Sequence, residues 1–175
     1  SDIDGLRALA VLAVVFHHAF PEYLKGGFVG VDIFFVISGY LISSIILKNL
    51  ENNNFCLYEF YARRIKRIFP SLLLVLSFCV LLGWFVLTDV EYIQLGKHIK
   101  ASTLFYTNFT LAKEAGYFDL ASIAKPLLHL WSLAVEEQFY IFWPLLLYFG
   151  RKYSLNLLSI SIVMLLFSFF ISINI

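Results

Sequence analysis

Arginine and histidine occur together in the first apolar run of the chain, where both are costly to bury. Arg7 and His18 are eleven residues apart. Eleven steps of a helix return within about 20° of the same face and rise roughly 16 Å. From spacing alone, His18 can be an interfacial histidine and Arg7 a snorkelling anchor. In the other interpretation His18 is a general base or a nucleophile, because the pKa of histidine lies near working pH.

Acidic residues also interrupt apolar runs at two places. Asp32 follows the glycine-dense stretch 26–30. It can cap a helix, pair with a basic residue or orient a histidine. Glu136 lies seven residues after His129, on the same helix face, and Glu137 follows it directly. Adjacent acids in an apolar helix indicate a polar interior cavity, used either for chemistry or for a structural network.

A basic segment, residues 59–70, predicts a short amphipathic helix that ends at Pro70. Within it, Arg67 is four residues from Arg63 and three from Arg64, so the three side chains cluster. Such a cluster can set topology and bind anionic headgroups. It can equally act as a phosphate clamp, because guanidinium groups hold phosphates through paired hydrogen bonds.

The composition determines where these residues must work. Of the 175 residues, 61% are hydrophobic and only 14% are charged, with a net charge of +1. Soluble domains are about 25% charged. These values exclude disorder, a nucleic-acid-binding tail and a typical cytosolic enzyme, so no nucleic acid partner is expected. Cys56 and Cys79 have no partners at metal-ligand spacing, and no metal site is predicted.

The apolar runs predict an all-α fold, an integral membrane helical bundle of about five transmembrane helices. The runs are too long and continuous for the alternation of a membrane barrel. The expected spans are residues 6–20, 28–47, 71–88, 127–149 and 155–175. Because the last run reaches the end of the chain, the sequence is expected to be part of a longer protein.

Basic residues near the span ends predict the orientation. They concentrate at 48–67 and 151–152, and the positive-inside rule places both segments in the cytoplasm. The N-terminus is then cytoplasmic, and the protein is expected to be a multi-pass protein of the plasma (inner) membrane. The segment 89–125 would lie outside. Its partly amphipathic pattern, including Leu95 and Ile99, predicts a helix lying on or dipping into the bilayer.

Four blocks of sequence, taken in order, resemble the acyltransferase-3 family of multi-pass membrane acyltransferases. This family includes enzymes that O-acetylate bacterial surface polysaccharides. The blocks are residues 4–7 with His18, residues 27–40, residues 61–70 and residues 129–144. No departure from the family pattern occurs within them. The family domain has more spans than this chain supplies, so residues 1–175 are expected to be the N-terminal part of one membrane acyltransferase domain.

The resemblance implies a role for each candidate residue. The expected catalytic residues are His18, Arg7, Glu136 and Asp32, and the expected donor-binding residues are Arg64, Arg67 and Arg63. The family glutamate corresponds better to Glu136 than to Glu137. The implied donor is acyl-CoA, expected to be acetyl-CoA, on the cytoplasmic side. The implied acceptor is a hydroxyl of a carbohydrate or lipid-linked glycan beyond the bilayer.

The hypothesis that follows is O-acyl transfer without a metal, since a thioester is already activated. His18 acts as general base or carries the acyl group transiently, and Asp32 or Glu136 orients its imidazole. A membrane transporter is the alternative, because charged residues in short helices also mark substrate paths in carriers. A carrier should tolerate lysine at Arg64 and Arg67, whereas a bidentate phosphate clamp should not. An inactive family member acting as a scaffold is a third interpretation.

Overall fold

The computed structural model describes residues 2–114 and 125–174, and within these ranges the chain is helical with no strand. The predicted all-α fold is thereby confirmed. The elements are α1 (Asp2–Ala19), η1 (Gly27–Val29), α2 (Gly30–Glu51), α3 (Leu57–Val86), α4 (Asp89–Thr103), α5 (Thr107–Glu114), α6 (Leu130–Lys152) and α7 (Leu157–Asn174).

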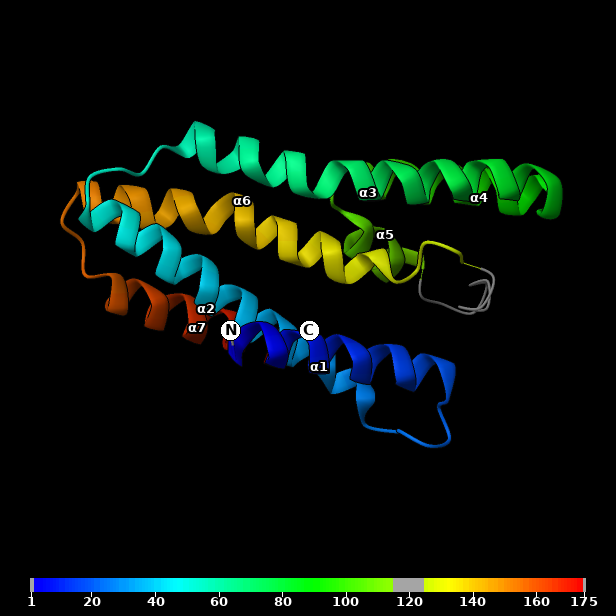
Figure 1. Ribbon diagram of the computed structural model, residues 1–175, viewed down its shortest axis with the longest axis horizontal. Helices are drawn as coiled ribbons and strands as arrows, with labels where there is room; N and C mark the ends of the chain where they lie inside the picture. The colour runs from blue at the N-terminus through cyan, green and yellow to red at the C-terminus, as the bar shows by residue number, and fades with distance from the viewer. Residues whose placement is uncertain (1, 115–124, 175) are drawn as a thin grey trace.

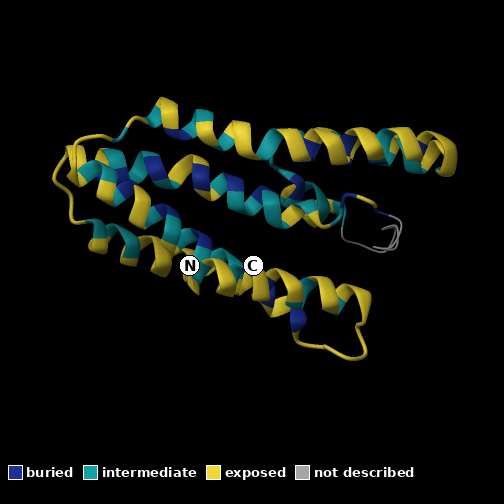
Figure 2. Cartoon of the chain, viewed as in Figure 1, coloured by how far each residue is buried: buried dark blue, intermediate teal, exposed yellow. Residues whose placement is uncertain are grey.

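Helix α6 crosses the middle of the molecule, with α3 on one side and α2 on the other (Figure 1). α1 packs along α2, α4 packs along α3, and α4, α5 and α7 also contact α6. Buried residues concentrate on α6, whereas α1 and α7 are largely exposed (Figure 2). α6 therefore organises the fold and places its polar residues against several helices.

The core is divided into two clusters along α6. One joins α2, α3 and α6 and consists of Ile42, Ile46, Phe60, Tyr140 and Leu147. The other joins α3, α4 and the approach to α6 and consists of Leu72, Leu76, Leu95 and Leu127. Hydrogen bonds fix the first cluster. The Tyr61 hydroxyl donates to the Ile141 carbonyl at 2.7 Å, and the Trp143 indole donates to the Ser43 hydroxyl at 2.7 Å.

The glycine-dense stretch brings α1 and α2 into close contact. A Cβ atom at Gly30 would overlap the carbonyl oxygen of Ala10 and lie 2.8 Å from Cγ2 of Val14. At Gly27 it would lie 2.6 Å from Cβ of His17. The expected close backbone approach is therefore confirmed, because no larger residue fits between these helices.

Pro70 does not end a helix, contrary to the sequence prediction. α3 continues through Pro70 as one helix of 30 residues. A proline inside a helix loses one hydrogen bond and costs about 3 kcal/mol. Burial of Leu72 and Leu76 just beyond it offsets that cost, and a break among apolar residues would leave more backbone groups unsatisfied.

Within the part of the chain that the structure describes, two helices are long and apolar enough to cross a membrane, at Gly27–Glu51 and Leu57–Val86. Each of the five predicted runs forms a helix, but a bundle of five spans is not confirmed. α1 is 18 residues long and carries three charged residues, Asp2, Asp4 and Arg7. The apolar part of α7, Leu157–Ile171, is shorter than the two helices that are long enough to cross a membrane.

The amphipathic segment packs on protein through the face that was expected to meet the bilayer. Leu95 is buried, and Tyr92, Ile99 and Phe105 pack around the second core cluster. Leu104 is exposed. α3 and α6 supply the apolar surface that covers much of this face, and the position of the helix in the bilayer stays a prediction. The end of the predicted segment, residues 115–124, lies outside the described residues.

Candidate functional site

A cavity of about 380 Å³ brings Arg7 together with the arginine cluster of α3. Arg63, Arg64 and Arg67 line it from α3, and Asp4 joins Arg7 from α1. The two basic groups come from different helices, so their convergence could not be found from spacing. Four guanidinium groups around one cavity suit an anion with several oxygen atoms, such as a diphosphate.

Aromatic rings support two of these guanidinium groups. The guanidinium carbon of Arg64 lies 3.6 Å from the centre of the Tyr140 ring, and that of Arg7 lies 5.2 Å from the centre of the Phe34 ring. The buried Nε of Arg7 has no hydrogen-bond partner among the described residues. Arg63 differs, because it is exposed and pairs with Glu59 at 3.2 Å.

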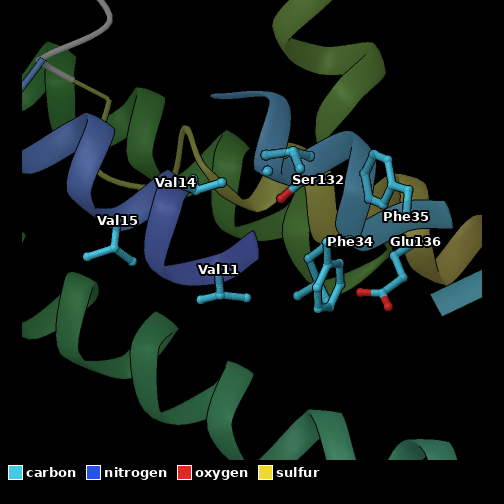
Figure 3. A pocket seen from close by; sticks show the side chains of 10 residues that line it. Val11, Val14, Val15, Phe34, Phe35, Ser132 and Glu136 are labelled. Atoms are coloured by element: carbon cyan, nitrogen blue, oxygen red, sulfur yellow. The ribbon is translucent and has the colours of Figure 1, made fainter. Parts of the chain in front are cut away.

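Glu136 lies deeper between the helices and is held by Tyr140. The Tyr140 hydroxyl donates a hydrogen bond of 2.5 Å to Oε1 of Glu136, one helical turn away. Glu136 lines a cavity of about 270 Å³ with three valines of α1, Val11, Val14 and Val15 (Figure 3). These valines follow Arg7 and precede His18, so the cavity lies beside the part of α1 that separates them.

A third cavity shares lining residues with each of the other two. It has a volume of about 450 Å³ and shares Phe35 and Glu136 with the valine-lined cavity. It shares Ser38 and Tyr140 with the arginine cavity. The three cavities are therefore neighbours, in the order from the arginines, past Glu136, to the valines of α1.

His18 lies beside a second histidine from another part of the chain. Its ring centre is 4.5 Å from that of His129, which immediately precedes α6. The His17 ring centre lies 5.4 Å from that of His18, and its Nδ1 lies 2.7 Å from the carbonyl oxygen of Leu24. His129 was not among the predicted catalytic residues. The one signal for it was its position on the same helix face as Glu136.

Neither acid predicted to orient His18 touches it. Asp32 is exposed in the first turn of α2, where its charge suits the positive end of the helix dipole. Glu136 is bonded to Tyr140, and it lies about 10 Å along α6 from His129. Among residues 2–114 and 125–174, no hydrogen bond joins Asp32 or Glu136 to His18. The orienting role of these acids stays a prediction.

Glu137 occupies the opposite side of Arg64. It is 6% exposed, and its Oε1 has no hydrogen-bond partner in the described part of the chain. With Arg64 it lines a separate, mainly apolar cavity of about 440 Å³. Arg64 thus borders both cavities, whereas Glu136 alone of the two acids belongs to the series leading along α1.

A buried ionic cluster that the sequence did not indicate ties α4 to α5 and to the approach to α6. Oε2 of Glu114 lies 2.9 Å from Nε2 of His98 and 3.1 Å from Nζ of Lys125. The same carboxylate accepts a hydrogen bond from the side-chain amide of Gln94. His98 is 1% exposed. No group of three His, Cys, Asp or Glu residues that could hold a metal ion occurs within the described ranges.

The fold and the site define an all-helical membrane-type protein with a basic cavity between its helices. The chain belongs to the acyltransferase-3 family, because the family model described as an acyltransferase domain matches residues 1–175.

Curated relatives agree with this assignment. The chain is 44% identical over 151 residues to the "Putative peptidoglycan O-acetyltransferase YrhL" of Bacillus subtilis, a match covering 85% of this chain and 24% of that protein. It is 42% identical over 182 residues to the "Putative O-acetyltransferase SACOL0978" of Staphylococcus aureus, a match covering 98% of this chain and 30% of that protein. It is 41% identical over 150 residues to the "O-acetyltransferase OatA" of Staphylococcus aureus, a match covering 84% of this chain and 24% of that protein.

The chain therefore spans between 24% and 30% of the length of these relatives. No solved structure matches the chain significantly.

Proposed function

We propose that the whole protein is a membrane-bound O-acyltransferase. It moves an acyl group, expected to be acetyl, from cytoplasmic acyl-CoA to a hydroxyl of an envelope glycan. Family membership and the names of the relatives support acyl transfer. The observation that carries the proposal is the series of cavities along α1. It begins at Arg7 and the α3 arginines and runs past Glu136 on the stretch of α1 that leads to His18.

The arginine cavity is the donor end of this arrangement. Coenzyme A carries phosphates, and guanidinium groups bind phosphate oxygens through paired, charge-assisted hydrogen bonds. Arg64 binds them together with Arg67 and Arg63, whose side chains are more exposed. Arg7 lies further in and meets the pantetheine arm. The apolar cavities beyond it exclude water and thereby protect the thioester from hydrolysis.

His18 carries out the transfer at the other end of α1. As general base, it accepts the proton of the acceptor hydroxyl while the oxygen bonds to the thioester carbonyl carbon. The carbon–sulfur bond breaks, and the coenzyme-A thiolate leaves and takes up that proton. In the covalent variant, the imidazole nitrogen bonds to the carbonyl carbon first and the thiolate leaves. The acceptor oxygen then bonds to the carbonyl carbon, the carbon–nitrogen bond breaks, and the hydroxyl proton passes by way of the released imidazole to the thiolate.

Residues 1–175 form the N-terminal part of one membrane acyltransferase domain in this proposal. The N-terminus is cytoplasmic, and the protein crosses the plasma membrane several times. The acceptor is an extracytoplasmic carbohydrate or lipid-linked glycan. The name of the Bacillus subtilis relative specifies peptidoglycan, which supports a cell-envelope glycan as the acceptor.

Acyl transfer by the full-length protein in membrane vesicles tests the proposal. Labelled acetyl-CoA is supplied to the cytoplasmic face in inverted vesicles and to the opposite face in right-side-out vesicles. Wild type is compared with His18→Ala, and with His17→Ala as the control imidazole, at matched expression. We expect label on a glycan only with cytoplasmic donor, loss of label in His18→Ala and retention in His17→Ala.

Two results would contradict the proposal. Equal transfer by wild type and His18→Ala would remove His18 from the chemistry. Accumulation of a labelled solute without any acetyl-CoA-dependent modification of glycan would instead favour the transporter alternative.

A further inference from the structure

Tyr140 makes two different contacts with two different parts of its side chain. The face of its ring lies under Arg64, with 3.6 Å between the guanidinium carbon and the ring centre. Its hydroxyl donates to Glu136. Tyr140 itself is 3% exposed and belongs to the core cluster of α2, α3 and α6. The side chain therefore has a fixed place between a donor-binding arginine and a deeper carboxylate.

Tyr140 also stands where two cavities meet. Together with Ser38 it lines both the arginine cavity and the 450 Å³ cavity that reaches Glu136. A ligand extending from the arginines towards Glu136 passes this wall. The position of Tyr140 thus bears on both the binding end and the reacting end of such a ligand.

We propose that Tyr140 is a positioning residue that presents Arg64 to the donor phosphates with its ring and holds Glu136 beside the acyl path with its hydroxyl. This inference rests on the proposed acyltransferase function. It gives the Tyr140 side chain a part in both donor binding and acyl transfer. Substitution can remove the hydroxyl contact with Glu136 while keeping the ring contact with Arg64.

The geometry of a guanidinium group explains the first role. Its five N–H donors lie in the plane of the group, and its two faces carry none. Stacking a face of Arg64 on Tyr140 leaves the N–H edges free for a phosphate. The contact also restricts a long side chain, so less conformational entropy is lost when the phosphate binds.

The hydroxyl explains the second role. A carboxylate beside an apolar cavity needs a hydrogen-bond donor to stay in one orientation. Tyr140 supplies that donor from one turn away on the same helix. Without the hydroxyl, Glu136 can rotate and take up another orientation, which changes the transfer step and leaves the arginine site intact.

Two substitutions in the full-length protein separate the roles. Tyr140→Phe keeps the ring and removes the hydroxyl, whereas Tyr140→Leu removes both. In the vesicle assay with increasing acetyl-CoA, we expect Tyr140→Phe to lower kcat by on the order of tenfold with KM unchanged. We expect Tyr140→Leu to lower kcat similarly and also to raise KM for acetyl-CoA by about tenfold. The matched controls are Tyr148→Phe and Tyr148→Leu, because Tyr148 lies on α6, pairs with the rings of Phe55 and Phe149, and lines neither the arginine cavity nor the cavities at Glu136.

A third variant keeps the test decisive if Tyr140→Leu does not fold. Glu136→Gln should lower kcat as Tyr140→Phe does, and the double variant should be no worse than the poorer single one. Additive losses would overturn the role of the hydroxyl.

Binding of coenzyme A, measured by calorimetry on purified full-length protein, separates this inference from the proposed function. Weaker binding to Tyr140→Leu with unchanged binding to Tyr140→Phe supports the role of the ring even if no glycan is acetylated. Equal binding to both variants would overturn that role even if the wild type transfers acetyl groups normally.

Discussion

The imidazole rings of His18 and His129 lie in contact, tilted by 58° and with 4.5 Å between their centres, one at the end of α1 and the other at the start of α6. A neutral imidazole carries one N–H donor and one acceptor nitrogen. Two rings this close can exchange a proton when the N–H of one turns towards the acceptor nitrogen of the other. If His18 receives the proton of the acceptor hydroxyl, His129 is the neighbouring group best placed to share it.

His129→Ala should lower acyl transfer by about tenfold or more, because general acid–base partners typically contribute at least that much. KM for acetyl-CoA should not change, since His129 does not line the arginine cavity. Initial rates at saturating and limiting donor concentrations separate the two parameters. His17→Ala is again the control imidazole. A kcat equal to that of wild type in His129→Ala would show that the ring contact is only structural.

Arg64→Lys should raise KM for acetyl-CoA by about tenfold. An ammonium group keeps the charge, but it cannot form the paired hydrogen bonds of a guanidinium or stack on Tyr140 in the same way. Arg151→Lys, at the exposed end of α6, is the matched control and should leave KM unchanged. Full tolerance of lysine at position 64 would favour a purely topogenic charge and thus the transporter alternative.

Local periodicity was sufficient to predict part of this site. The helical repeat placed Arg7 and His18 on one face, and α1 is continuous across both residues. The density of glycines predicted the close approach that Gly27 and Gly30 make to α1. Both features depend on residues near one another in the chain, where helical geometry determines the outcome.

Contacts between distant helices could not be predicted in this way. Nothing in the spacing of residues indicates that His129 meets His18, or that Arg64 stacks on Tyr140. Pro70 misled the prediction for a related reason. The local rule ends a helix there, but packing of distant residues against the helix beyond Pro70 outweighs the lost hydrogen bond.

Glu114→Gln should destabilise the protein by about 3 kcal/mol, because it removes the charge of a carboxylate to which two buried basic groups bond. His98 and Lys125 both bond to this carboxylate, and both are buried. The midpoint of thermal unfolding in detergent measures the effect. Glu51→Gln, at the exposed end of α2, removes the same charge as a control and should leave the midpoint unchanged. Equal midpoints for the two variants would mean that the cluster contributes nothing to stability.

Gly30→Ala should separate α1 from α2 and lower both stability and acyl transfer. The added Cβ would overlap the carbonyl oxygen of Ala10, an atom of the backbone that cannot rotate away. Overpacking of this kind costs about 1–3 kcal/mol. Gly26→Ala is a matched control, because its Cβ would meet nothing within 4 Å. Thermal unfolding and the vesicle assay should both distinguish the two variants. A Gly30→Ala protein as stable and active as Gly26→Ala would show that α1 can shift without cost, and that its close contact with α2 does not position Arg7 and His18.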